Sequence, residues 1–311
     1  MSQITLLDGG MGQELVHRAG DRPTPLWSTQ VMIDHPGLVQ AVHADYFAAG
    51  ATIATTNTYA IHRDRLIKAG IEDRFAALHG AALAEAAAAI AAHRATKDDN
   101  AKQGRVGRIA GSIGPLVASY RPDVHPPHDT AVALYSEAAQ LLAPGVDLIL
   151  CETVSSLAHA RAILQGAQAA GLPVWLSVTV DDADGTCLRS GERVADLAQI
   201  LELGAGTPTA ILANCSSPEA IGATLAILAG FGLPFGAYAN GFQQITPAFL
   251  QENPTVDALS ARHDLTPAAY ADFALSWVAQ GATIVGGCCE VGPAHIAAIA
   301  TALRAAGHEL V

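Results

Sequence analysis

The feature that most constrains the fold is a regular alternation of short apolar runs with helical stretches along the chain. Strands that alternate with helices pair in parallel, so the pattern predicts an α/β fold. The expected strands are Ile4–Leu7, Thr52–Thr55, Arg108–Ala110, Val146–Leu150, Val174–Val180, Ala210–Ala213, Phe235–Ala239 and Ala282–Val285. The expected helices are Pro36–Ala49, Arg63–Ala95, Asp129–Ala143 capped by Asp129, Ser155–Gly171 capped by Ser155, Leu197–Leu203, one that begins at Pro218, Thr266–Ala279 and Gly292–Ala306. The polar segment Lys97–Gly107 is expected to be a mobile loop.

Eight such strands in 311 residues predict a single (β/α)8 TIM barrel over residues 1–311. The polar residues favour this fold, because they follow the carboxyl ends of the expected strands. In a barrel these ends form the face that carries the active site. The residues are Asp8, Thr56, Asn57, Ser112, Glu152, Cys215, Asn240 and Cys288. An open doubly wound sheet remains the alternative, since it is built from the same alternation.

The composition narrows the class of protein. A net charge of −12 argues against nucleic acid or an anionic membrane as the main partner, because both attract clusters of Lys and Arg. The N-terminus lacks the basic segment and apolar run of a signal peptide, and no transmembrane span is expected. Five cysteines, an odd number in a long chain, indicate thiols kept reduced in a cytoplasmic protein.

Three cysteines are placed where chemistry is expected. Cys288 and Cys289 follow the last expected strand and Gly286–Gly287, while Cys215 closes another strand. Neighbouring side chains in a strand point to opposite faces, so the glycines are expected to supply the unusual dihedrals that turn both sulfurs the same way. Three thiolates would leave one position of a zinc ion open, as in catalytic sites. A redox-active Cys288–Cys289 pair is the alternative, although it leaves Cys215 without a role.

The remaining candidate ligands have simpler interpretations. Cys151 and Cys187 are expected to be buried as small apolar residues. His125 and His128 flank two prolines and are expected on a solvated loop rather than at a metal.

At this point the sequence resembles a known family, the zinc-dependent homocysteine S-methyltransferases. Asn214–Cys215 and Gly286–Cys289 match its two zinc-ligand motifs, and further segments match in the same order over Leu6 to about Ile299. These segments are Leu7–Gly12, Thr56–Tyr59, Gly111–Gly114 and Cys151–Thr153. Members of this family are (β/α)8 barrels, in agreement with the fold expected from the strand pattern.

The resemblance implies a reaction and a cofactor. Cys215, Cys288 and Cys289 would hold Zn²⁺, and the thiolate of L-homocysteine would take the open position and accept a methyl group, giving methionine. Zinc deprotonates a bound thiol, so no general base is needed at the sulfur. The net negative charge of the site suits a cationic donor, with S-methylmethionine favoured and S-adenosylmethionine second. Oligomeric state is left open.

The amino-acid end of homocysteine needs its own contacts. The resemblance assigns Glu152 and Asp8 to its ammonium group, and the backbone N–H groups of Gly9 and Gly10 could approach its carboxylate. An ordinary turn or cap role for Asp8 and a nucleotide phosphate loop at Gly9–Gly12 are the alternatives.

Three further residues complete the expected substrate site. The resemblance places Tyr59 near the metal, with Thr58 beside it, and Asn240 is expected to position the cysteine-bearing loops. A tyrosine that only packs under the rim is the alternative for Tyr59.

The donor side matches the family least. The segments Pro115–Asp123 and Gly241–Gln244 depart from the family pattern, and no aromatic cage is expected. A related thiol or selenol methyltransferase, or a non-enzymatic zinc- or redox-sensing thiol protein, therefore remain alternative functions.

Overall fold

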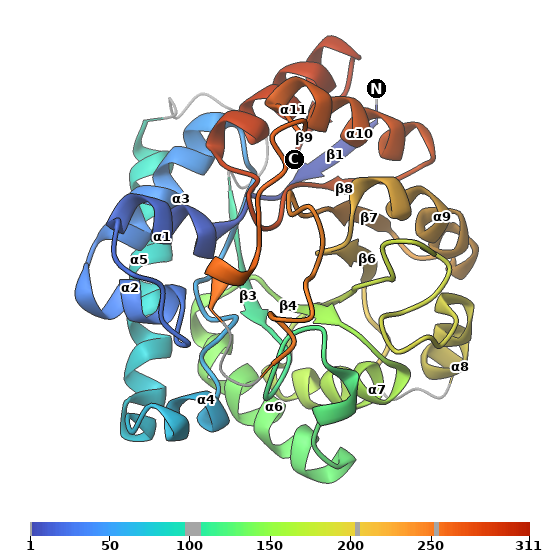
Figure 1. The fold of residues 1–311 in the computed structure, drawn as a ribbon. Coiled ribbons are helices and arrows are strands. Elements are labelled where there is room, and N and C mark those ends of the chain that lie inside the picture. Colours follow the sequence, from blue (N-terminus) through green and yellow to red (C-terminus); the bar gives the residue numbers. More distant parts are fainter. Residues whose placement is uncertain (1, 97–106, 203–205, 252–254) are drawn as a thin grey trace.

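The strands form one parallel sheet that curls into a barrel, with helices around it (Figure 1). The computed structural model describes residues 2–96, 107–202, 206–251 and 255–311. The hydrogen-bonded order of the strands is β2-β3-β4-β5-β6-β7-β8-β1-β9. The ring closes between β1 and β2, where the Thr52 N–H donates to the Leu6 carbonyl at 2.7 Å. This confirms the barrel over the open sheet.

The strands are short, as is usual for a barrel of this type. They are β1 (Gln3–Leu6), β2 (Ile53–Thr55), β3 (Arg108–Ile113), β4 (Leu148–Val154), β5 (Val174–Val178), β6 (Ala210–Asn214), β7 (Phe235–Tyr238), β8 (Ile284–Val285) and β9 (Glu309–Leu310). The helices are α1 (Met11–Ala19), α2 (Ser28–Asp34), α3 (Leu38–Ala49), α4 (Arg63–Lys68), α5 (Phe75–Ala95), α6 (His128–Leu142), α7 (Leu157–Ala167), α8 (Leu197–Glu202), α9 (Pro218–Leu228), α10 (Pro267–Ala279) and α11 (Pro293–Ala305).

The alternation of side chains along the strands separates two cores. In β4, Leu148 and Leu150 belong to a cluster inside the barrel, whereas Ile149 and Cys151 face the helices. The same period of two continues to Glu152, which therefore points into the barrel above Leu150.

The eight predicted strands are all present, but several elements were not predicted correctly. The elements α1, α2 and β9 were not predicted, and α4 and α5 were predicted as one helix. A single helix is wrong there because Gly70 adopts a left-handed φ of 71° after α4. The predicted loop Lys97–Gly107 lies outside the described residues except for Gly107.

Two predicted helix caps are also wrong by a residue or two. Pro127, not Asp129, is the N-cap of α6, and Ser156, not Ser155, is the N-cap of α7. The Ser156 hydroxyl accepts a hydrogen bond from the His159 N–H at 3.1 Å, the usual contact of a capping serine.

One helix contradicts the expectation that no segment approaches a membrane span. The stretch Glu72–Ala95, which includes α5, is long and apolar enough to cross a membrane by length and composition, with a mean hydropathy of 1.5. In this fold α5 packs beside α3 (Figure 1) and buries Leu78, Ala82 and Ala86. A buried core helix passes the same test, and 39% of the most apolar window is buried here.

Candidate metal and substrate site

A cavity of about 620 Å³ opens at the carboxyl ends of the strands. Asp8, Glu152, Cys215, Cys288 and Cys289 all line it, as the sequence predicted for the catalytic face. Its volume falls within the range of roughly 300–1,000 Å³ that is typical of small-molecule sites.

The three cysteines meet at the floor of this cavity. Their sulfur atoms all lie within 4.8 Å of one another. In this structure Cys215 and Cys288 form a disulfide, with their Cα atoms 5.8 Å apart, and Cys289 is a free thiol. The expectation of five reduced thiols is therefore wrong here, and so is the Cys288–Cys289 pairing of the redox alternative. The disulfide joins two sulfur atoms that come from the segments after β6 and β8 and point toward the same position.

The backbone of Cys215 explains how its sulfur reaches the cavity. Alternation along β6 would turn Cys215 outward, because Asn214 faces the interior. Cys215 instead adopts a left-handed φ of 50°, which breaks the alternation. A non-glycine residue in this conformation needs surrounding contacts to hold it.

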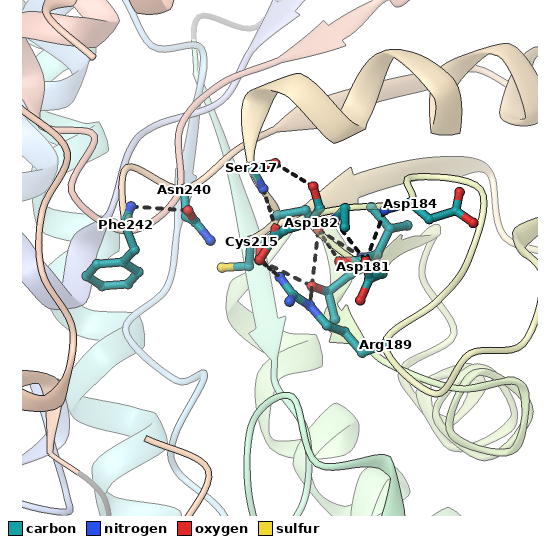
Figure 2. Close-up of polar contacts among 12 residues, drawn as sticks. Asp181, Asp182, Asp184, Arg189, Cys215, Ser217, Asn240 and Phe242 are labelled. Carbon is teal, nitrogen blue, oxygen red and sulfur yellow. Dashed lines mark hydrogen bonds and ion pairs between the residues drawn. The ribbon is translucent and has the colours of Figure 1, made fainter. Parts of the chain in front are cut away.

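Side chains from the segment after β5 provide these contacts (Figure 2). The Thr179 hydroxyl and the Arg189 guanidinium donate to the Cys215 carbonyl at 3.2 and 3.4 Å. Asp182 pairs with Arg189 at 2.9 Å and also accepts from the Ser217 N–H at 2.7 Å. This network could not be predicted from the sequence, since nothing in the local pattern around Arg189 points to Cys215.

The glycines before Cys288 serve a different purpose from the one predicted. Neither Gly286 nor Gly287 has a left-handed φ. Instead, a Cβ at Gly286 would lie 2.5 Å from the Leu7 side chain, and one at Gly287 would lie 2.1 Å from that of Val291. The two glycines are needed for close packing of the loop. The Tyr270 hydroxyl also donates a hydrogen bond to the Gly286 carbonyl at 3.0 Å.

Gly9 and Gly10 pack against the same loop. A Cβ at Gly9 would approach the Val291 carbonyl to 2.0 Å, and one at Gly10 would approach the Cys288 carbonyl to 2.5 Å. The Gly10 N–H already donates to the Val291 carbonyl at 3.0 Å. The predicted contact between Gly10 and a substrate carboxylate is therefore wrong, and the structure gives no support to a phosphate loop.

Glu152 is a buried carboxylate at the cavity, with 8% of its surface exposed. It accepts hydrogen bonds from the hydroxyl groups of Ser112 at 2.5 Å and Tyr238 at 3.3 Å. Burial raises the pKa of Glu152 from 4.5 to about 7, and the two hydrogen bonds oppose this shift. A cation placed beside it would favour the ionised form.

Asp8 is buried as well and is not a helix cap. Its two oxygens accept from the N–H and the hydroxyl of Thr55, both at 2.7 Å. Burial raises its pKa from 3.8 to about 7, and the charge of Glu152 adds to the shift. Behind Asp8, at 4.0 Å, lies His43, whose pKa burial lowers to about 3, so this imidazole is neutral near pH 7.

The other predicted substrate residues differ in their placement. Tyr59 lines the cavity and shares a hydrogen bond of 2.8 Å with Ser119, while burial raises its pKa to about 12. Thr58 instead donates its hydroxyl to the Ser112 carbonyl at 2.7 Å. The Asn240 side chain accepts from the Phe242 N–H at 3.1 Å (Figure 2). The Thr58 hydroxyl thus holds the backbone of a neighbouring strand, and Asn240 holds the loop that pairs with Cys289, as expected for a residue that positions the cysteine-bearing loops.

Aromatic side chains form much of the cavity wall. They are Trp27, Tyr59, Tyr120, Tyr238, Phe242 and Phe249. Trp27 and Tyr120 have left-handed φ angles of 49° and 62°, as Cys215 does, so unusual backbone geometry gathers at this site. These aromatic residues come from segments far apart in the sequence, so their gathering at one cavity could not be predicted from local spacing.

The residues interpreted as uninvolved lie away from the three sulfurs. Cys151 is buried in the core between β4 and the helices, as predicted. Cys187 is only partly buried, and its thiol donates to Asp184 at 3.4 Å, so the prediction of a buried apolar role is wrong for it. His128 is exposed, whereas the His125 ring lies 4.8 Å from the His159 ring rather than in solvent.

The three sulfurs suit a metal ion of the zinc type. Zn–S bonds of about 2.3 Å in a tetrahedron place sulfur atoms roughly 3.8 Å apart, which is compatible with their present separation once the disulfide is reduced. Burial raises the pKa of the Cys289 thiol to about 12, an effect that a coordinated cation would reverse.

Comparisons with known proteins agree with this site. Residues 5–303 match the family model described as homocysteine S-methyltransferase. The chain is 32% identical to the homocysteine S-methyltransferase of Escherichia coli K12, covering 95% of this chain and 94% of that protein. It is 28% identical to homocysteine S-methyltransferase YbgG of Bacillus subtilis 168, with 97% and 95% covered.

Solved structures give the same result. The metallated form of the homocysteine methyltransferase MmuM from Escherichia coli has a TM-score of 0.78, with 30% identity and 96% of each chain covered. The oxidized form of the same protein also has a TM-score of 0.78, with 31% identity over 96% of this chain and 95% of that one. The family model, the relatives and the fold coincide, and the chain therefore belongs to the homocysteine S-methyltransferase family of enzymes.

Proposed function

We propose that this protein is a cytoplasmic, zinc-dependent enzyme that transfers a methyl group from a sulfonium donor to the sulfur of L-homocysteine, giving methionine. S-methylmethionine is the favoured donor and S-adenosylmethionine the second. The observation that carries the proposal is the meeting of three cysteine sulfurs within 4.8 Å beside two buried carboxylates in one cavity.

Cys215, Cys288 and Cys289 would hold the metal in the reduced protein. When bound, Zn²⁺ would keep the acceptor sulfur deprotonated and nucleophilic and would orient it for displacement. Support for a metal comes from the donor set itself and from the metallated form of the similar MmuM structure. The Cys215–Cys288 disulfide has to be reduced first, because a disulfide offers no thiolate.

Glu152 and Asp8 would bind the ammonium group of homocysteine. Both are buried, and each has a raised pKa because its charge is poorly solvated. An ammonium group would neutralise this charge and restore the ionised carboxylates. Ser112, Tyr238 and Thr55 fix the orientation of the two carboxyl groups through the hydrogen bonds described above, and the Gly9 backbone is the remaining candidate for the substrate carboxylate.

The aromatic wall supports a cationic donor. Aromatic rings attract cations through their faces, and the effect strengthens where water is excluded. Tyr59 and Tyr120 reach the cavity from the loops after β2 and β3. A sulfonium group held between such rings loses its positive charge as the methyl group departs, so the wall would orient the donor toward the acceptor sulfur.

A donor panel tests the proposal. The reduced, zinc-supplied protein is incubated with homocysteine and, separately, S-methylmethionine, S-adenosylmethionine, or a quaternary ammonium donor such as glycine betaine, and methionine is measured. Methionine formed fastest from a sulfonium donor is expected, and Cys289→Ser should abolish it. A protein that binds zinc but forms no methionine with any donor would contradict the proposal and favour a thiol sensor.

A further inference from the structure

Arg65 lies in the wall of the cavity with part of its guanidinium group uncommitted. It belongs to α4, after β2, and lines the cavity. Its Nη2 donates to the Pro115 carbonyl at 3.1 Å. Its Nε is buried and has no hydrogen-bond partner among the residues that the structure describes. A buried charged donor without a partner is costly, so such a group is a good candidate for contact with a ligand.

The other cations at the cavity are placed differently. Arg121 donates to both oxygens of Asp123 and to the Leu250 carbonyl, so its guanidinium group is already engaged within the protein. Lys68 lies one helical turn after Arg65 on α4 and is exposed. Arg65 is half-buried and its guanidinium group is only partly engaged, and Lys68 adds positive charge at the rim beside it.

The negative and positive groups therefore lie in different parts of the cavity. Its floor holds the three cysteines and the acidic pair Asp8 and Glu152, whereas Arg65 and Lys68 stand on a separate element. Tyr59 also lines the cavity, where the charges of Glu152 and Arg65 shift its pKa in opposite directions. A ligand that spans the cavity would place a cation toward the floor and an anion toward α4.

We propose that Arg65 binds the carboxylate of the methyl donor, so that the donor is an amino-acid sulfonium rather than a simple alkylsulfonium. This inference rests on the proposed function and adds the way in which the donor is recognised. Homocysteine is anchored at the cavity floor by its sulfur and its ammonium group. The carboxylate of the methyl donor lies on the side of the sulfonium that faces away from homocysteine, so it is the anion nearest α4. The guanidinium group of a cavity-lining arginine offers the parallel N–H donors that a carboxylate accepts, and in Arg65 one of these donors, Nη2, is already bonded to the Pro115 carbonyl.

The variant Arg65→Met tests this assignment. With S-methylmethionine as donor, kcat/KM for the donor should fall about 10- to 100-fold, as expected for loss of a charge-assisted hydrogen bond. Arg65→Lys should recover part of the loss. The matched control is Arg63→Met on the same helix, because Arg63 pairs with Glu72 and Glu137 away from the cavity; its donor kinetics should match the wild type.

A second donor separates recognition from structural damage. The decarboxylated analogue (3-aminopropyl)dimethylsulfonium should be a poor donor for the wild type and an equally poor one for Arg65→Met. A variant that loses the same factor with both donors would show a structural effect and overturn the assignment. A rise in KM for homocysteine alone would also overturn it, because Arg65 would then bind the acceptor.

The same experiment distinguishes this inference from the function on which it rests. If the wild type transfers methyl groups and Arg65→Met leaves donor kcat/KM unchanged, only the Arg65 assignment fails. If the wild type forms no methionine from any donor, the proposed function itself fails. S-adenosylmethionine, which carries the same amino-acid group, should respond to Arg65→Met by a similar factor where it serves as a donor.

Discussion

The guanidinium group of Arg189 donates a hydrogen bond to the backbone carbonyl of Cys215 at 3.4 Å. The same group pairs with Asp182 at 2.9 Å and lies over the Tyr120 ring, 5.3 Å from its centre. Arg189 thus connects a cysteine at the cavity floor with an aromatic residue of the wall, and both of these residues have left-handed backbones. This contact holds the Cys215 sulfur in place from outside the cavity.

Replacing Arg189 should weaken metal binding without unfolding the barrel. In Arg189→Met the Cys215 turn loses one of its two side-chain donors, and residues that support metal ligands typically contribute 10- to 100-fold in affinity. Zinc affinity, measured by competition with a chromophoric chelator, should fall within that range. Arg193→Met is the control, because Arg193 is exposed and pairs with Asp196 three residues along the chain. Equal zinc affinity in both variants would refute the role.

Glu152→Gln should impair homocysteine binding while zinc stays bound. The amide keeps the shape and can still meet Ser112, but it removes the negative charge that would face the substrate ammonium. KM for homocysteine should rise about 10-fold or more, as expected for a charge-assisted hydrogen bond. Steady-state kinetics with metal analysis of the same sample check this. Unchanged homocysteine binding would remove Glu152 from the site.

The buried carboxylates make stability depend on pH. Burial raises the pKa of Glu152 from 4.5 to about 7, so the folded state holds this proton more tightly than the unfolded state does. The resulting stability is complete below about pH 4.5 and is lost as the pH rises through 7. The loss is on the order of 3 kcal/mol.

Urea unfolding without substrate at pH 5 and pH 8 measures this effect. The free energy of unfolding should fall more between the two values for the wild type than for Glu152→Gln, which cannot titrate. Asp8 contributes in the same direction in both proteins, but its pKa is raised less in Glu152→Gln because the charge of Glu152 is gone, which widens the expected difference. An identical fall in both proteins would mean that the Glu152 pKa is not raised.

Much of the barrel could be predicted from the sequence because its signal is local. β-branched runs such as Thr52–Thr55 and stops such as Gly171 act within a few residues. The missed helices α1 and α2 have weaker local signals, and they are fixed by tertiary contacts. Trp27, for example, donates to Gln13 at 3.0 Å, and its ring fills the space that a side chain at Gly12 would need.

The site was predictable to a different extent. The cysteines and Glu152 lie near the carboxyl ends of strands, where a parallel barrel brings them together, although β4 continues past Glu152 to Val154. Arg189 and the Tyr270 hydroxyl act on backbone carbonyl groups far away in the chain, so no spacing reveals them. The purpose of Gly286 was misread for the same reason, since its neighbour Leu7 comes from the other end of the sequence.

Gly10→Ala should damage the site through packing alone. The added Cβ would lie 2.5 Å from the Cys288 carbonyl, so the cysteine loop has to shift. We expect a loss of about 1–3 kcal/mol in stability together with weaker zinc binding. Gly80→Ala is the matched control, because a Cβ at Gly80 in α5 meets nothing within 4 Å and should stabilise the helix by up to about 1 kcal/mol. Thermal unfolding of both variants checks that the two substitutions change stability in opposite directions. A Gly10→Ala variant as stable as the wild type would contradict the close approach of Gly10 to the Cys288 carbonyl.

The metal content of the fully reduced protein, measured with its transfer activity, tests the central claim most directly. The account predicts close to one zinc ion per chain, loss of methionine formation when a chelator removes it, and recovery when zinc is returned. A chain that forms methionine at its full rate with no metal bound would contradict it.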